Sequence, residues 1–279
     1  MHKIGLLSKT IAALLGTFML SGAASAGNIL YVADCASGGC LNSSIATVLT
    51  GDGHIVTSVT GDFSAGTNPT LAGSLAGYSH VYWAASGDGF GNQHTSAATF
   101  TNLSNFVSAG GRVFVTGYDS IISPNDPSLI TFLGGTGTAT DTGAPTGTVI
   151  NVANSLTTGV VDIRNVTPTG AYGDRDGLNG LVAGTVGVAS NGGSATSFQW
   201  TLRTFGLGEI AYVSNGSYTG DVETASWADT SAGGAGAYNA ALRNFAAAGD
   251  TIDVPEPASL AILGLGLAGL GFARRRMAA

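Results

Sequence analysis

The chain has 279 residues, of which 44 are glycine and only 10% are charged, against about 25% in an ordinary soluble domain. A net charge of −7 argues against a nucleic-acid-binding protein, which needs basic patches to neutralise phosphate. Glycine does not recur at every third position, which excludes collagen, and 44% hydrophobic residues argue against wholesale disorder. The length suits one large domain or two small ones.

The first 26 residues have the three parts of a secretory signal peptide. Lys3 and Lys9 supply a positive start, residues 11–20 form an apolar stretch too short to span a bilayer, and Ala24-Ser25-Ala26 supplies the small residues of a cleavage site. The sequence therefore predicts export across the inner membrane and a mature chain that begins at Gly27. An uncleaved N-terminal anchor or a buried helix is the alternative.

The C-terminal residues 254–279 form a second targeting segment. Pro255-Glu256-Pro257 precedes an apolar run at residues 260–273, and three arginines follow this run. The run is short for a permanent transmembrane helix, and the arginines are expected to stay cytoplasmic, which leaves the body of the protein outside. Motif, helix and basic end together resemble the PEP-CTERM protein-sorting signal of Gram-negative bacteria.

This resemblance implies that the secretion machinery exports the protein and that an exosortase, a membrane-embedded cysteine protease, recognises its sorting motif. It implies a transient membrane anchor, followed by a place on the outer surface or in the extracellular matrix. Such proteins are associated with exopolysaccharide and biofilm production. A generic tail anchor is the alternative. The residues that carry the signal are Pro255, Glu256, Pro257, Arg274, Arg275 and Arg276.

The body at residues 27–253 is a polyanion once both ends are set aside. It contains five arginines, no lysine and sixteen acidic residues, a net charge of −11. Such a surface repels anionic polymers unless cations bridge the two, so nucleic acid is a still less suitable partner. Cys35 and Cys40, with two glycines between them, are expected to form a small disulfide loop in an exported protein. A zinc site would need further ligands, and a redox pair a C-x-x-C spacing.

The body alternates β-prone runs with helical patterns. Strands are predicted at residues 28–33, 54–59, 80–85 and 112–116, and helices at 41–49, 71–75 and 95–108. This alternation indicates right-handed βαβ units, and hence an α/β body with a parallel sheet covered by helices. Beyond Ser123 the pattern loosens, with helices predicted at 127–133 and 238–248 and strands at 147–152, 182–189, 198–205 and 209–214.

Element order and four short motifs resemble the class I glutamine amidotransferase-like superfamily. The motifs are Gly110-Gly111-Arg112-Val113-Phe114-Val115 and the segments 154–160, 206–212 and 239–245. The resemblance covers most of the body. It implies a flavodoxin-like three-layer sandwich with a parallel sheet and additional β strands in the second half.

Enzymes of that superfamily carry a nucleophile on a sharp strand-to-helix turn and a histidine later in the chain. Here Asp119 occupies the usual cysteine position, and no histidine follows His94. The family's dyad is therefore absent, and we expect no amidotransferase activity. Ser120 could instead form a dyad with His54, His80 or His94, but nothing in their spacing along the chain favours such a pair.

Ligands of doubly wound sheets bind beyond the carboxyl ends of the strands, so acidic and hydroxyl-bearing residues there are candidates for a site. These are Asp34, Asp62, Ser86, Asp88, Asn92, Tyr118 and Asp119. Their oxygens could hold Ca²⁺ or hydrogen-bond a sugar, and the alternative is a set of solvated loops left by an enzyme ancestor.

Two other segments suggest a ligand. Asp174, Asp176 and Asn179 have nearly the spacing of a calcium loop, although the final glutamate of an EF-hand is missing and a polar turn is the alternative. Threonines alternate through residues 136–142 and would share one face of an extended segment, where they could present hydroxyls to ice or polysaccharide.

Together these patterns predict an exported, surface-sorted and non-catalytic component of the envelope or matrix, with no cofactor other than Ca²⁺. A hydrolase or lyase that uses Asp88 and Asp119 as acid, base or nucleophile is the first alternative. Adhesion to ice or another surface through the threonine face is the second.

Overall fold

The structure, a computed structural model, describes most of the body and neither targeting segment. It describes residues 26–34, 43–61, 68–85, 96–117, 120–121, 126–136, 138–142, 147–169, 175–215, 226–231 and 233–248. The predicted disulfide of Cys35 and Cys40, the sorting motif and the apolar run at residues 260–273 lie outside these ranges.

The described elements alternate strand and helix in the first half and become mostly strands in the second. In chain order they are β1 (Asn28–Asp34), α2 (Ser43–Gly51), β2 (Ile55–Gly61), β3 (His80–Ala85), α3 (Ala97–Ser108), β4 (Arg112–Thr116), α4 (Pro127–Leu133), β5 (Ala139–Thr142), β6 (Arg175–Asn179), β7 (Thr185–Ser190), β8 (Ser197–Phe205), β9 (Gly208–Val213) and α6 (Gly236–Ala248).

One nine-stranded sheet joins these strands in the order β2-β1-β3-β4-β9-β8-β6-β5, with β7 paired to β8. The first five strands of this order are mutually parallel, and the remaining pairings are antiparallel. An order that starts 2-1-3-4 and closes with a later parallel strand is that of flavodoxin-like folds. The predicted α/β fold with a parallel sheet and added β strands is confirmed.

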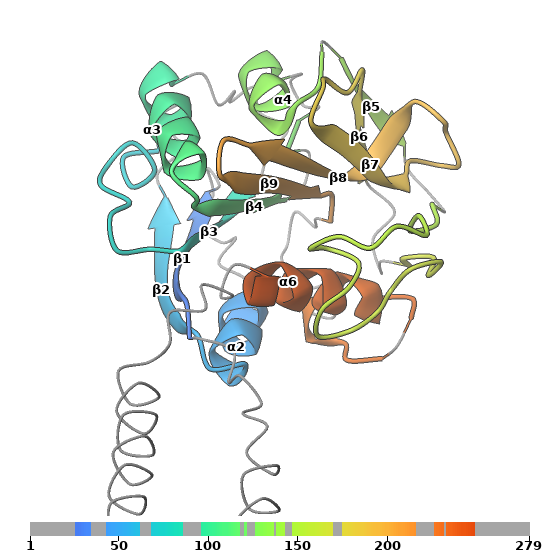
Figure 1. Ribbon diagram of the computed structural model, residues 1–279, viewed down its shortest axis with the longest axis horizontal. Helices are drawn as coiled ribbons and strands as arrows, with labels where there is room; N and C mark the ends of the chain where they lie inside the picture. The colour runs from blue at the N-terminus through green and yellow to red at the C-terminus, as the bar shows by residue number, and fades with distance from the viewer. Residues whose placement is uncertain are drawn as a thin grey trace, which may run out of the picture.

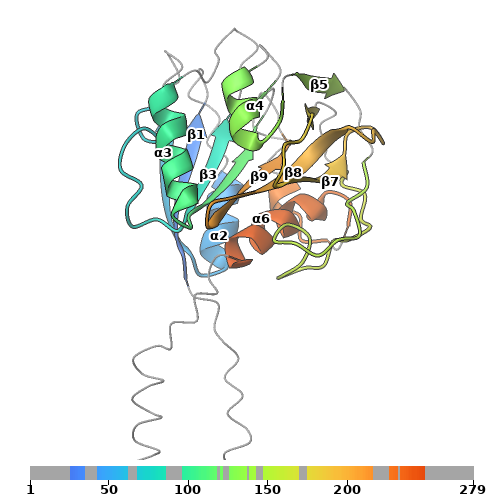
Figure 2. The same ribbon diagram turned by 45° about the horizontal axis from the view of Figure 1, so that its top comes forward.

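Helices cover both faces of the sheet (Figures 1 and 2). On one face α2 and α6 bury a core that includes Ile45 and Phe245, both at most 1% exposed. On the other face α3 and α4 bury a second core that includes Leu103 and Leu133. Strand residues alternate between the two cores, as the pleat of a sheet covered on both faces requires. All residues of both cores lie between Ile29 and Ala246, so the body carries its own complete core.

The structure differs from the sequence prediction at three segments. The helix expected at residues 71–75 is a series of turns, at whose start the Asn68 side chain accepts the Leu71 N–H at 2.9 Å. The strand expected at residues 147–152 is reduced to one isolated bridge between Val149 and Ala189. Residues 175–179, interpreted as a loop or turn, form the strand β6.

The strands predicted at residues 198–205 and 209–214 are confirmed, and a tight hairpin turn joins them. β8 and β9 pair antiparallel, with Phe205 opposite Gly208 across the turn. Gly206 has a φ of +62°, and an added Cβ there would lie 2.5 Å from the Ser108 Cα, so both conformation and space require glycine. This tight turn starts β9 next to β4 in the sheet.

Both ends of the described body lie at the amino edge of the parallel strands. β1 starts there, and the end of α6 returns to the same edge because Phe245 lies against Arg112, the first residue of β4. Arg243 in the last turns of α6 forms an ion pair with Asp52, which lies just before β2. The carboxyl edge, where ligands bind in related sheets, is therefore at the opposite end of the body from both termini (Figure 1).

Candidate functional site

Six buried polar residues gather where the parallel strands end, and we call them the carboxyl-edge cluster. They are Thr116, Ser120, Asp176, Tyr212, Ser214 and Asn215, each at most 3% exposed. Thr116 ends β4 and Ser120 follows it, while Tyr212, Ser214 and Asn215 come from the end of β9 and just after it. Asp176 reaches the cluster from β6, on the antiparallel side of the sheet.

Hydrogen bonds within the cluster join three separate parts of the chain. Asp176 Oδ2 accepts the Ile121 N–H at 3.2 Å, and the Asp176 N–H donates to Ser214 Oγ at 2.8 Å. Ser120 Oγ lies 3.2 Å from the Tyr212 hydroxyl. The Ser120 hydroxyl and the Asp176 carboxylate thus fix the turn after β4 against β6 and β9.

One donor of the cluster has no acceptor among the described residues. Thr116 Oγ1 donates to the Asn215 carbonyl at 3.1 Å, but the Asn215 side-chain Nδ2 is buried and makes no hydrogen bond within the described part of the chain. A buried unsatisfied amide costs about 1–3 kcal/mol, so an oxygen from a water or ligand would be favoured there. Asn215 was not among the residues that the sequence singled out.

Of the seven residues predicted at this edge, the structure places one. Asp34 is the last residue of β1 and lies in register with Gly61 of β2 and Ala85 of β3, so these three strands end together. Asp62 and Ser86 come directly after those strand ends, but they lie outside the described residues, as do Asp88, Asn92, Tyr118 and Asp119. Convergence of their side chains stays a prediction.

The described histidines lie at the other edge of the sheet. His80 is the first residue of β3 and is in register with Arg112 at the start of β4. The rise along β4 from Arg112 to Thr116 is about 13 Å, so His80 cannot reach Ser120. His54 precedes β2, and its Nδ1 accepts the Gly27 N–H at 3.2 Å. His94 lies outside the described residues.

His80 is a buried neutral group and not a poised base. Burial, followed by the positive charge of Arg112 and the proximity of His54, lowers its pKa from 6.5 to about 3. Ser79 Oγ lies 2.9 Å from His80 Nδ1 and provides a local partner. This environment is that of a structural histidine at the start of a strand.

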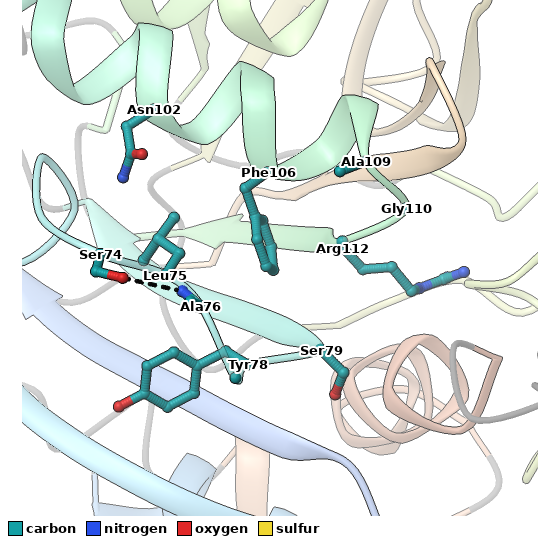
Figure 3. Close-up of a pocket in the computed structure, with 12 residues that line it drawn as sticks. Ser74, Leu75, Ala76, Tyr78, Ser79, Asn102, Phe106, Ala109, Gly110 and Arg112 are labelled. Atoms are coloured by element: carbon teal, nitrogen blue, oxygen red, sulfur yellow. Dashed lines mark hydrogen bonds between the residues drawn. The ribbon is translucent and has the colours of Figure 1, made fainter.

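A shallow cavity of about 590 Å³ also lies at the amino edge, between the segment at residues 74–79 and the end of α3 (Figure 3). Its polar side chains are used within the fold. Asn102 donates to the carbonyls of Leu71 and Gly73 at 2.7 and 2.6 Å. The Arg112 side chain extends away from Phe106 and toward α6. It forms an ion pair with Glu209 of β9 at 2.6 Å. The cavity therefore presents mainly apolar and backbone groups.

Two residues of the predicted calcium loop lie on a strand in the structure. Asp176 and Asn179 are three positions apart in β6, so their side chains point to opposite faces. Asp176 lies in the carboxyl-edge cluster, while Asn179 Nδ2 donates to Thr140 Oγ1 of β5 at 2.8 Å. The two do not converge as loop ligands would, and Asp174 lies outside the described residues. Among the described residues, no group of three histidine, cysteine or acidic side chains could hold a metal ion.

The alternating threonines occupy a short strand at the margin of the sheet. Of residues 136–142, only the last four form β5, and Thr140 is half-buried against Asn179. Thr136 and Thr138 are exposed, and the Thr142 side chain is not described. An extended flat row of hydroxyls is therefore not present in the described part of this segment.

Comparison with known proteins identifies the C-terminal segment. Residues 253–276 match the family model of the PEP-CTERM protein-sorting motif. The chain carries this sorting signal. The PEP-CTERM motif indicates an exported protein that is transiently anchored in a membrane and processed by an exosortase. Among the described residues no helix is long and apolar enough to cross a membrane.

No curated protein matches the chain, and the body is remotely similar to several solved structures. PurLQS from Thermotoga maritima is 11% identical, with a TM-score of 0.48, over 78% of this chain and 97% of its own. A cytoplasmic protein from Salmonella typhimurium LT2 is 12% identical, with a TM-score of 0.44, over 67% of this chain and 86% of its own. A ThuA-like protein from Parabacteroides merdae is 11% identical, with a TM-score of 0.39, over 67% and 78%. Likeness at this level assigns no function to the body.

Proposed function

We propose that the PEP-CTERM protein is a non-catalytic component of the cell envelope or extracellular matrix, linked to exopolysaccharide, whose body binds glycan at its carboxyl edge. The observation that carries the proposal is the position of the termini. Residues 249–259 join α6 to the apolar run of the tail and can span at most about 40 Å. While the tail is anchored, the amino edge is the part of the body that is tethered to the membrane, and the carboxyl edge lies at the opposite end of the body.

The chemistry of the described residues supports binding over catalysis. Ser120 and Asp176 are at most 2% exposed and are engaged in the hydrogen bonds that hold the edge together. His54 and His80 lie at the opposite edge, so neither can act as a base for Ser120. The Asn215 amide N–H has no acceptor within the described part of the chain, which suits a neutral hydroxyl or carbonyl oxygen of a ligand. This pattern is also consistent with an amidotransferase-like ancestor whose dyad has been lost.

The net charge of the body restricts which classes of glycan it can bind. With a net charge of −11, the body repels uronic-acid or sulfated polymers unless divalent cations bridge them. Neutral glycans should therefore bind without added metal, and anionic ones only with Ca²⁺. The acidic residues predicted at the carboxyl edge, Asp88 and Asp119 among them, are the candidates for such a bridging ion.

A glycan array probed with the purified body at residues 27–253, with and without Ca²⁺, tests the proposal. Binding should decrease in the Asn215→Ala variant and in the Asp88→Asn, Asp119→Asn double variant, while Asp229→Asn, remote from this edge in the sequence, should bind as the parent does. The same samples are assayed for hydrolysis of glycans and aryl esters. Turnover that disappears in Asp119→Asn would replace the binding function with the hydrolase alternative.

A further inference from the structure

An outermost strand of the sheet has one side without a neighbouring strand, and we call this side a margin. One long margin is covered by no other segment of the described structure. β2, seven residues long and free of charged residues and proline, is the outermost strand on its side (Figure 1). The opposite margin, β5, has four residues and carries Asp141. The free side of β7 is covered in part, because the Ile150 N–H donates to the Val188 carbonyl at 2.8 Å. Natural sheets usually shorten, charge or cover their margins, since open ones pair with other chains.

The backbone groups that β2 presents outward follow from its pairing with β1. The Ile55 N–H donates to the Gly27 carbonyl, so the residues at odd positions of β2 face β1. Because successive residues of a strand alternate, the N–H and C=O groups of Val56, Ser58 and Thr60 point away from the sheet. Within the described residues these groups of Val56 and Ser58 form no backbone hydrogen bond. They provide a ready template for one more strand.

An uncharged groove runs beside this margin. Its volume is about 550 Å³, and it lies between α2 and β2. The residues that line it are Ala46, Thr47, Thr50, Gly51, Val56 and Ser58. None is charged, whereas the body as a whole has a net charge of −11. Two such bodies repel each other through most of their surface and can approach closely only where charge is absent. The margin at β2 with this groove is such a surface.

We propose that β2 is a self-association site at which a second copy of this chain adds its own β2 in antiparallel orientation. A two-fold axis through an open strand margin produces antiparallel pairing of the same strand. Centred on Ser58, it places Ser58 opposite the partner's Ser58 and Val56 opposite the partner's Thr60. This register uses all three outward-facing residues and gives a continuous sheet through the two bodies. The two α2 helices then lie on the same face and bring the two grooves together.

The orientation of such a pair has a consequence for sorting. In an antiparallel pair the amino edges of the two bodies point in opposite directions, and the C-terminal segments leave from those edges. Anchoring of both tails in one membrane therefore restrains the pairing, and processing of the tail by an exosortase removes this restraint. The pairing goes beyond glycan binding and does not depend on it, because β2 is the outermost strand whereas Asn215 follows β9, which lies between β4 and β8 in the sheet.

Charge variants at the two-fold centre test the pairing. The purified body at residues 27–253 is expected to sediment as a dimer, more strongly at higher ionic strength because salt screens the repulsion. Ser58→Lys places two lysines together and should weaken the dimer by about tenfold or more, as should Ser58→Asp. An equimolar mixture of the two variants should restore it. Thr57→Lys, one position along the same strand, is the control for folding and for charge, and should weaken the dimer less.

A body that stays monomeric under all these conditions would overturn the proposal, as would a dimer that Ser58→Lys leaves unchanged. Cross-linking gives an independent measurement. Opposed Ser58 residues would have Cα atoms about 5.5 Å apart, within the range of a disulfide, so Ser58→Cys should cross-link on oxidation. Thr57→Cys should do so far less. Full-length Ser58→Cys chains inserted in one membrane should cross-link less efficiently than the free body, and equal cross-linking of the two would contradict the restraint that the antiparallel geometry imposes on anchored chains. Loss of glycan binding without loss of the dimer would refute only the proposed function.

Discussion

The two edges of the parallel sheet bury polar groups in different ways. At the amino edge, Arg112 forms an ion pair with Glu209 at 2.6 Å, and Ser155 donates a further hydrogen bond to the same carboxylate. The Arg112 guanidinium also lies 4.2 Å from the ring centre of Phe245. At the carboxyl edge, the carboxyl-edge cluster consists of hydroxyls and an amide around the carboxylate of Asp176.

The two edges are therefore expected to respond differently to substitution. The amino edge has a network of opposite charges that holds the end of α6, from which the sorting segment continues. The carboxyl-edge cluster combines neutral hydrogen bonds with the one that the Asp176 carboxylate accepts from the Ile121 N–H, and it leaves the Asn215 amide without an acceptor among the described residues. Substitutions at the amino edge should therefore change stability most, whereas substitutions at the carboxyl edge should change stability less and ligand binding more.

The largest expected effect is at the amino edge. Arg112→Ala removes the counterion of Glu209 and the cation above Phe245, and should lower the free energy of unfolding by about 3 kcal/mol. Chemical denaturation of the body measures this. Arg164→Ala is the matched control, because Arg164 forms an ion pair with Asp162 and both side chains are exposed. Equal losses in the two variants would contradict a special role for the amino edge.

The next effect is a dependence of stability on pH through His80. Its pKa in the folded state, about 3, is below the ordinary value of 6.5, so the unfolded chain binds the proton more tightly. The stabilisation is complete above pH 6.5 and decreases as the pH falls toward 3, by about 1.4 kcal/mol for each pH unit.

Comparison of the parent body with His80→Gln isolates this contribution. The difference in unfolding free energy between them should change by about 2 kcal/mol between pH 6.5 and pH 5. A difference that stays constant over this range would show that His80 is not neutral and buried in solution.

At the carboxyl edge, Asp176→Ala should cost about 1.5 kcal/mol, because the Ile121 N–H loses its acceptor. Asp141→Ala provides the matched control, since Asp141 is the register partner of Asp176 on β5 and is exposed. Denaturation should show little change in this control. If Asp176→Ala costs more than Arg112→Ala, the ranking of the two edges is wrong.

The sequence predicted the parallel half of the sheet well, and in the antiparallel half it located β7 and β8 but not β6, for physical reasons. β1, β3 and β4 are continuous apolar runs buried on both faces, which have a clear pattern. β6 has the sequence Arg-Asp-Gly-Leu-Asn, which has low β propensity and resembles a turn. It is a strand because of its neighbours: an added Cβ at Gly177 would lie 2.1 Å from Ser197 Oγ, so glycine allows the close approach.

The same limits apply to the candidate site. The ends of the parallel strands, and hence the position of Asp34, followed from the order of elements. Asp176 was assigned to a calcium loop because its partners, Ile121 and Ser214, are 55 and 38 positions away and leave no local pattern. Alternation of Asp176 and Leu178, both at most 1% exposed, was the one local signal that could have indicated a buried strand.

The smallest expected effect concerns the ion pair between α6 and the start of β2. Arg243 donates to both oxygens of Asp52, at 2.6 and 2.7 Å, but both side chains remain about one-quarter exposed. Solvent screens such a pair, so Arg243→Ala should cost about 0.5 kcal/mol. Asp52→Ala should cost a similar amount, and the double variant should cost less than the sum of the two, which denaturation of all four proteins measures. This pair links the end of α6, from which the sorting segment continues, to the turn between α2 and β2. A strictly additive result would mean that the pair does not stabilise the amino edge, which would then depend on Arg112 and Glu209.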